Sequence, residues 1–392
     1  MGVCPTHTVT VPQHIGLVTV GGAAWMGGAN YVRHLAAALH AAAPGTQTSF
    51  ICGDTLLNDW REVQPRIDVL TRSTFLRQLW NSEGTLRRAV QRAGIEFVYP
   101  ITYDNQYNLG MRFPIGKQLG GAAWCGWIPD FQHRYLPQLF APEEIRQREN
   151  GIAQLIEEAP RVVLSSRNAA ADFCRFYPAY REKAEVLTFA TMPMQLSESS
   201  VPAASNAPDR FFLVCNQFWK HKNHQVVFDA LRLLRKRGVT PTVLCTGRMD
   251  DLRDRTYGDA LRAALSNDCL DDQVRLLGII PRTEQIALMR RALAVIQPSL
   301  FEGWSSVVED ARALGRPCLL SDLPVHREQN PPGARFFPPT APEVLADLLA
   351  EAFLNWRAGP DLAAEAVAQE DARTRLRDVG MNFLRIAAIG NS

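Results

Sequence analysis

Short apolar segments alternate with amphipathic segments along nearly the whole chain, and this alternation limits the possible folds more than any other feature. In the first half, residues 14–20, 48–53, 96–102 and 161–166 have the apolar, β-branched character of strands, while 29–43 and 167–177 have helical periodicity. The second half repeats the pattern from residue 210 to residue 322. Strands that alternate with helices predict parallel βαβ units, so we expect an α/β protein.

A Pro-, Ser- and Ala-rich stretch at 192–209 has no hydrophobic period and separates the two series. The chain has 392 residues, whereas a single core stops growing near ~250–300 residues. We therefore expect two domains. The predicted boundaries are 1–195 for the first domain, 196–209 for the linker, 210–371 for the second domain and 372–392 for a C-terminal helix that returns to the first.

Composition argues against several classes of function. A net charge of +2 gives no global field for nucleic acid. The eight cysteines form no CxxC pair and suit small buried side chains in a reducing compartment. Gly2 and Thr6 fit a loose myristoylation pattern, but no apolar run is long enough to predict a membrane span and no secretory leader is recognisable. We expect the protein in the cytoplasm or at the inner face of the membrane.

The segment LFEGWSSVVEDARALGRP, residues 300–317, places carboxylates around the start of a predicted helix. With Ser306 as the N-cap, Glu309 falls at N3 and completes a capping box, which is a purely structural role. The free N–H groups of such a helix end bind phosphate oxygens, whereas Glu302 and Asp310 suit sugar hydroxyls. The segment is therefore typical of a site for a phosphorylated sugar compound.

The longer stretch PSLFEGWSSVVEDARALGRPCLLSDLP resembles the donor-site signature of retaining family 4 glycosyltransferases. This resemblance implies the GT-B fold, in which two Rossmann-like domains face each other across a cleft. Glu302 matches the first glutamate of the signature. The second glutamate falls on Asp310, with Glu309 one residue earlier, so either could contact the ribose.

The resemblance also implies the other parts of the donor site. Glu302 would face the donor sugar, and the first glycine-rich loop, WMGGAN, would let a diphosphate or an acceptor approach its backbone. In VCNQFWKHKNHQ, Lys222 matches a phosphate-binding lysine, but Gln217 holds the place of an arginine that Lys220 or Arg248 could replace. The remaining residues expected to bind the nucleotide-sugar are Gly27, Gly28, Gly278, Ile279 and Ile280, near the first loop or the base, and Trp304, Ser305, Ser306 and Val307, whose backbone would hold the diphosphate.

GWIPDFQHRYLPQLF resembles the acceptor-side segment in which many members have His-Asp. Asp130 matches the aspartate, Pro129 replaces the histidine, and His133 follows three residues after Asp130. His133 is a candidate base or donor-sugar contact, although a packed side chain is equally consistent with the pattern. The candidate catalytic residues are Glu302, Lys222, His133 and Asp130.

The reaction implied is transfer of a sugar, with retention, from a nucleoside-diphosphate sugar to a hydroxyl of a glycan or lipid-linked acceptor. No cofactor or metal is expected, because the acidic cluster Asp250, Asp251 and Asp254 suits an exposed loop better than a cation site. The partners expected are the donor and the acceptor, with possible peripheral membrane association and no nucleic acid. A non-catalytic sugar-nucleotide-binding subunit remains an alternative, as does an NAD(P)-linked enzyme, although GGAAWMGG does not match GxGxxG.

Overall fold

The computed structural model describes residues 9–22, 25–53, 60, 63–69, 82–104, 113–194, 207–249, 251, 253–254 and 256–390. The chain divides into two compact units. The first contains Met1–Phe131, Ala141–Met192 and Thr374–Ser392, and the second contains Gln132–Phe140 and Pro193–Arg373. Most of the predicted linker at 196–209, like the myristoylation pattern, lies outside the described residues.

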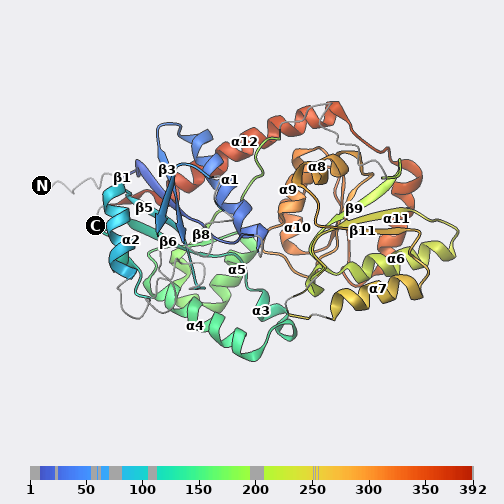
Figure 1. Ribbon diagram of the computed structural model, residues 1–392, viewed down its shortest axis with the longest axis horizontal. Helices are drawn as coiled ribbons and strands as arrows, with labels where there is room; N and C mark the ends of the chain where they lie inside the picture. Colours follow the sequence, from blue (N-terminus) through green and yellow to red (C-terminus); the bar gives the residue numbers. More distant parts are fainter. Residues whose placement is uncertain are drawn as a thin grey trace, which may run out of the picture. The chain divides into compact units, whose positions relative to one another are not determined.

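The first unit is built on a parallel sheet in the order β4-β3-β2-β5-β6-β7-β8 (Figure 1). Its strands are β2 (His14–Val18), β3 (Gln47–Gly53), β4 (Arg66–Val69), β5 (Phe97–Thr102), β6 (Ala123–Ile128), β7 (Val162–Leu164) and β8 (Ala184–Val186). The helices of this unit are α1 (Met26–Ala42), α2 (Ser82–Ala93), α4 (Pro142–Glu158) and α5 (Arg167–Phe176), with short 3-10 turns η4 (Gly116–Gln118) and η6 (Pro178–Lys183). All six residues of β5 are buried, as expected for a central strand covered on both faces.

The second unit has a parallel sheet in the order β11-β10-β9-β12-β13-β14. Its strands are β9 (Phe211–Cys215), β10 (Thr242–Thr246), β11 (Val274–Gly278), β12 (Val295–Gln297), β13 (Cys318–Ser321) and β14 (Arg335–Phe337). Its other elements are α3 (Gln132–Tyr135), η5 (Pro137–Leu139), η8 (Lys220–Lys222), α6 (His224–Lys236), α7 (Tyr257–Asn267), α8 (Arg282–Arg291), α9 (Ser306–Ala313), α10 (Pro324–Gln329) and α11 (Pro342–Asn355).

Successive residues of β9 supply two separate cores, because side chains along a strand point to opposite faces. Phe212 and Val214 pack with α6 and α11, whereas Phe211 and Leu213 pack with α8 and α9. Figure 1 shows these helix pairs on opposite sides of the sheet. Burial on both faces explains the nearly continuous apolar run FFLVC.

Helix α12 (Leu362–Ala387) contributes its first half to the second unit and its second half to the first. In the first unit, Phe383 packs edge-on against Phe97 and Tyr99. Gly380 lies where a Cβ atom would come within 2.1 Å of the Ala38 carbonyl oxygen, so only glycine permits this approach to α1. The strand β15 (Ile389–Gly390) then pairs antiparallel with β1 (Val9–Thr10).

The alternating pattern of the sequence therefore correctly predicted two α/β units with parallel sheets. One grouping differs from the expected boundaries, because the short segment Gln132–Phe140 belongs to the second unit. Its side chains explain this grouping, since Tyr135 packs on Phe301 and Arg253 lies over the ring of Phe140.

Candidate active site

Two loops of the second unit are bound together where the neighbouring parallel strands β9 and β12 end. The N–H of Leu300 donates to the carbonyl of His221 over 2.7 Å. The side chain of Asn223, a residue in the left-handed region at φ 55°, donates to the carbonyls of Pro298 at 3.1 Å and Pro339 at 2.9 Å. The carboxyl ends of parallel strands are where ligands of such sheets bind, so this pair of loops forms a candidate site.

Lys222 and Glu302, predicted to be catalytic, meet across these two loops. The Nζ of Lys222 lies 2.6 Å from the Oε1 of Glu302, and their side chains are 16% and 9% exposed. The structure therefore brings together the lysine from η8 and the glutamate that precedes α9. Both side chains are thus largely shielded from solvent.

Two further donors hold Glu302 in place. The side chains of Gln297 and Ser299 donate to the same Oε1 over 2.8 and 2.6 Å. Gln297, which is fully buried at the end of β12, in turn accepts from Asn216 at the end of β9 over 2.9 Å. Glu302 is thus oriented by a polar chain that runs through the ends of both strands.

This environment keeps Glu302 ionised. Burial by itself would raise its pKa, but the charge of Lys222 and the hydrogen bonds from Lys222 and Ser299 outweigh burial, and the pKa lies below its ordinary value. A carboxylate fixed in this way can stabilise positive charge developing on a sugar ring or accept a hydrogen bond from a sugar hydroxyl.

The histidines beside Lys222 are neutral at physiological pH. Burial, reinforced by the charge of Lys222, lowers the pKa of both His221 and His224 to about 3. His224 stacks on Phe218 with ring centroids 4.1 Å apart. The positive charges of η8 are therefore its two lysines, Lys220 and Lys222, and these histidines serve as packing.

Helix α9 begins one residue earlier than predicted. Ser305, not Ser306, is the N-cap, and its Oγ accepts from the N–H of Val308. Glu309 consequently lies at N4, and the predicted capping box is wrong. Gln329 makes the reciprocal bond instead, because its Oε1 accepts from the N–H of Ser305 over 3.2 Å and its Nε2 donates to the Ser305 carbonyl over 2.9 Å.

The shift of the N-cap leaves two donors at the start of the helix. Among the described residues, the N–H groups of Ser306 and Val307 have no hydrogen-bond acceptor, and both residues are half-buried. Unpaired N–H groups at the positive end of a helix dipole form an anion site. Trp304, also expected at the diphosphate, is half-buried just before the N-cap.

Glu309 and Asp310 face different surroundings. Glu309 is 2% exposed, accepts from Gln329 over 3.0 Å and lies 3.7 Å from Arg312. Asp310 instead contacts Arg282, the first residue of α8, over 2.6 Å. Asp310, unlike Glu309, is therefore paired with the helix that directly follows the predicted base-binding loop.

The predicted base-binding loop follows β11. Gly278 has φ 69°, and its carbonyl accepts from the N–H of Gly247 over 2.8 Å. Ile279 is 71% exposed, whereas Ile280 packs on the core beneath α8 and α9. An exposed apolar side chain beside a glycine turn suits a flat, partly apolar ligand such as a nucleobase.

Gln217 is half-buried after β9, and its side chain makes no hydrogen bond with any described residue. Lys220, one possible substitute for the missing arginine, is 53% exposed and pairs with Asp254 over 3.5 Å. Asp251 accepts from the N–H groups of Lys220 and Arg253. No group of three potential metal ligands occurs among the described residues, which omit Asp250.

In the first unit, Gly27 and Gly28 pack against Trp25. A Cβ on Gly28 would lie 2.8 Å from the Trp25 indole, and one on Gly27 would lie 3.3 Å from its Nε1. The indole stacks on Trp127 at 5.8 Å. The structure thus gives these glycines a packing role, while an approach of ligand to their backbone stays a prediction.

Asp130 and His133 fall in different units. Asp130 lies in the first unit, where its charge acts on Arg148. Burial by itself would lower the pKa of Arg148, but Tyr103, Asp130 and Glu144 together raise it. His133 is 1% exposed in the second, with its ring 6.4 Å from that of Phe140. A catalytic role for either residue remains a prediction.

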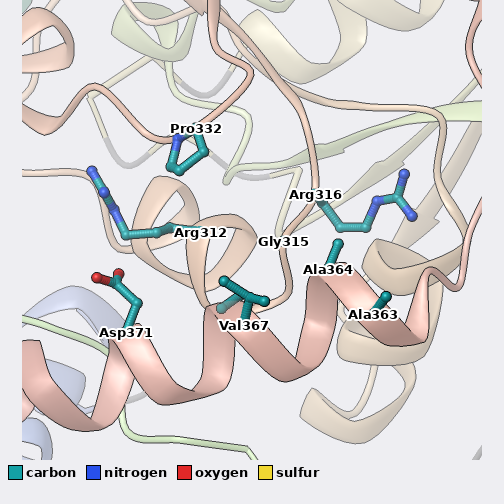
Figure 2. A pocket seen from close by; sticks show the side chains of 9 residues that line it. Arg312, Gly315, Arg316, Pro332, Ala363, Ala364, Val367 and Asp371 are labelled. Atoms are coloured by element: carbon teal, nitrogen blue, oxygen red, sulfur yellow. The ribbon is translucent and has the colours of Figure 1, made fainter.

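A cavity of about 540 Å³ lies at the other end of α9 and is separate from these loops. Figure 2 shows Val367 and Asp371 projecting from α12 on the side of Arg312 and Pro332, whereas Ala364 lies beside Arg316. Its lining is mostly apolar, and it contains none of the predicted site residues.

Comparison with known proteins identifies similar families and folds. Residues 197–370 match the family model described as Glycosyl transferases group 1. The matched residues cover most of the second unit. None of the curated proteins matches the chain.

Solved structures extend the likeness to the whole chain. Anabaena HepE, solved with UDP and glucose, is 16% identical over 96% of this chain and 99% of its own, with a TM-score of 0.69. Sucrose-phosphate synthase from Thermosynechococcus elongatus is 18% identical over 95% and 98%, with a TM-score of 0.66. A glycosyltransferase from Rickettsia africae is 14% identical over 97% and 99%, with a TM-score of 0.67. The predicted GT-B fold is confirmed.

Within the described part of the chain, no helix combines the length and apolar character that a bilayer crossing requires.

Sequence reasoning missed several polar residues of the second unit: Asn216, Gln297, Ser299, Gln329 and Arg282. Gln297 carried a signal, since a polar side chain within the apolar run LAVIQ needs a buried partner. Gln329 and Arg282 carried none, because their partners are distant in sequence.

Proposed function

We propose that the protein transfers a sugar from a nucleoside-diphosphate sugar to a hydroxyl acceptor with retention of anomeric configuration, as a family 4 glycosyltransferase. The observation that carries the proposal is the ion pair of Lys222 and Glu302 beside two unpaired N–H groups of α9, within the residues that match the group 1 glycosyltransferase model. A cation and a helix start suit a diphosphate, and a fixed carboxylate suits the attached sugar.

The proposed binding mode follows from these positions. The N–H groups of Ser306 and Val307 hold the diphosphate, and Lys222 neutralises charge on it. Asp310 accepts from the ribose hydroxyls, while the backbone around Gly278 contacts the base. Glu309 is assigned to the fold, because it is buried against Gln329.

The proposed reaction breaks the bond between the anomeric carbon and the diphosphate oxygen. The acceptor oxygen forms its bond to that carbon on the same face, and the acceptor proton passes to the departing diphosphate. Glu302 stabilises positive charge on the ring, and Lys222 with the start of α9 stabilises negative charge on the leaving group. The acceptor is proposed to be a glycan or a lipid-linked sugar, reached in the cytoplasm or at its membrane face.

We expect one nucleoside diphosphate to raise the melting temperature of the protein. UDP is the first probe because solved structures of Anabaena HepE hold UDP and UDP-glucose, and GDP and ADP follow. A ligand at about 100 times its Kd adds ~2.7 kcal/mol to stability. The screen is run by thermal unfolding, with the matching nucleoside as control.

Two outcomes would count against the proposal. If no nucleoside diphosphate stabilises the protein, the site does not bind a sugar nucleotide. If one stabilises it but its sugar nucleotides are never consumed, the protein is a non-catalytic binding subunit, the alternative favoured by Gln217 at a position where family members carry arginine.

A further inference from the structure

The position of Gln217 raises the question of which residue supplies the second positive charge to the donor phosphates. Besides Lys222, three cations that follow the ends of β9, β10 and β11 are candidates: Lys220, Arg248 and Arg282. Lys220 is largely exposed and pairs with Asp254. The choice therefore lies between Arg248, which follows β10, and Arg282, which begins α8.

Arg282 is the cation whose position is fixed at α9. Its Nη2 lies 2.6 Å from Oδ1 of Asp310, and its Nη1 donates to Gln285 over 2.7 Å. The Asp310 side chain is only 5% exposed, so it anchors the guanidinium against the helix. The guanidinium has five N–H donors in a planar fork, and these two contacts leave the others available.

The same guanidinium also stands beside the end of β9. Cys215 is the last residue of that strand, two positions before Gln217. Burial raises the pKa of its thiol to about 12. The charge of Asp310 also raises this pKa, whereas the charge of Arg282 lowers it. The Arg282 side chain remains 46% exposed, which leaves one edge open to a ligand.

Arg248 is attached to the same region only by its backbone, whose carbonyl accepts from the N–H of Phe218 over 2.9 Å. Its side chain makes no hydrogen bond, ion pair or ring contact with any residue in the described ranges. Such a side chain carries no positional constraint toward α9. Preorganised donors bind an anion at lower entropic cost, so the geometry favours Arg282.

We propose that Arg282 binds the phosphate nearest the ribose, supplying the positive charge that Gln217 does not, and that Asp310 positions its guanidinium. This inference rests on the proposed function, since it assigns Asp310 to the ribose side of a bound nucleotide. The phosphate attached to the ribose is the nearest anionic group to that carboxylate. An arginine fork can give such a phosphate two parallel hydrogen bonds.

The test compares a nucleoside diphosphate, the monophosphate and the nucleoside of the same base, titrated calorimetrically into the wild type and the variants. We expect Arg282→Gln to weaken the diphosphate and the monophosphate about tenfold each, as loss of a charged hydrogen bond does. The nucleoside should change less than twofold. The matched control, Arg248→Gln, should leave all three affinities within twofold.

Because Arg282→Gln leaves Asp310 buried without its cation, the double variant Arg282→Gln/Asp310→Asn is measured as well. This double variant removes both charges. In it, the affinity for the diphosphate and the monophosphate should still fall by more than the affinity for the nucleoside. An equal loss for all three ligands would mean that Arg282 only orders the ribose site, which overturns the proposal. A phosphate-dependent loss in Arg248→Gln alone would assign the role to Arg248. Failure of the wild type to bind any nucleoside diphosphate would instead refute the proposed function.

Discussion

Replacing Glu302 with glutamine is expected to lower the turnover of the donor about a hundredfold while nucleotide affinity stays within about threefold of wild type. The carboxylate Oε1 receives hydrogen bonds from Lys222, Gln297 and Ser299, and an amide oxygen can accept the same bonds. The shape of the loop should therefore survive. What glutamine lacks is the negative charge that stabilises the developing positive charge on the sugar.

The measurement is the steady-state rate of nucleoside-diphosphate release from the sugar nucleotide selected by the binding screen. Glu351→Gln is the matched control, because Glu351 is an exposed residue of α11 and the same charge is removed outside the site. A Glu302→Gln protein with a rate near that of Glu351→Gln would remove Glu302 from the chemistry.

Replacing Lys222 with methionine is expected to destabilise the protein by about 3 kcal/mol at neutral pH, the lower end of the range for breaking a buried ion pair. The lower end applies because Gln297 and Ser299 continue to donate to Glu302. Lys220→Met is the neighbouring control. Lys220 is 53% exposed and 3.5 Å from Asp254, so its loss should cost under about 1 kcal/mol.

The effect of Lys222→Met should depend on pH. In the wild type, Lys222 lowers the pKa of Glu302 despite its burial. The ion pair therefore contributes its full stability above the unfolded-state pKa of about 4.3. This contribution is lost as the pH falls through the lower pKa of the folded state. The stability difference between wild type and Lys222→Met should therefore narrow on acidification from pH 7 to pH 3. Urea unfolding across this range measures it. A difference that is constant with pH would show that Lys222 stabilises the fold through packing alone.

The alternation of strands and helices was sufficient to predict both sheets, because runs such as FFLVC are long enough to be buried on two faces and short enough to be strands. The resemblance singled out Lys222 and Glu302 separately, but their pairing was not predicted, since the two residues are 80 positions apart. Their meeting depends on β9 and β12 being neighbours, which local patterns do not encode.

The helix start was predicted one residue late for a physical reason. Ser305 and Ser306 are equally good N-caps by residue type, and Glu309 three residues after Ser306 favoured the second. Gln329 from α10 decides for Ser305 by bonding both its N–H and its carbonyl. A cap fixed by a tertiary contact cannot be recognised from the local sequence.

The most direct test of the proposed activity gives the wild-type protein an α-linked sugar nucleotide whose base the binding screen has identified, with water as the acceptor. The anomeric protons of the sugar are followed by NMR as the sugar nucleotide is consumed. The account predicts release of the nucleoside diphosphate and, before mutarotation mixes the anomers, appearance of the free sugar first as its α-anomer. Appearance of the β-anomer first would contradict retention at Glu302, and no release from any sugar nucleotide of that base would contradict the proposed transferase activity itself.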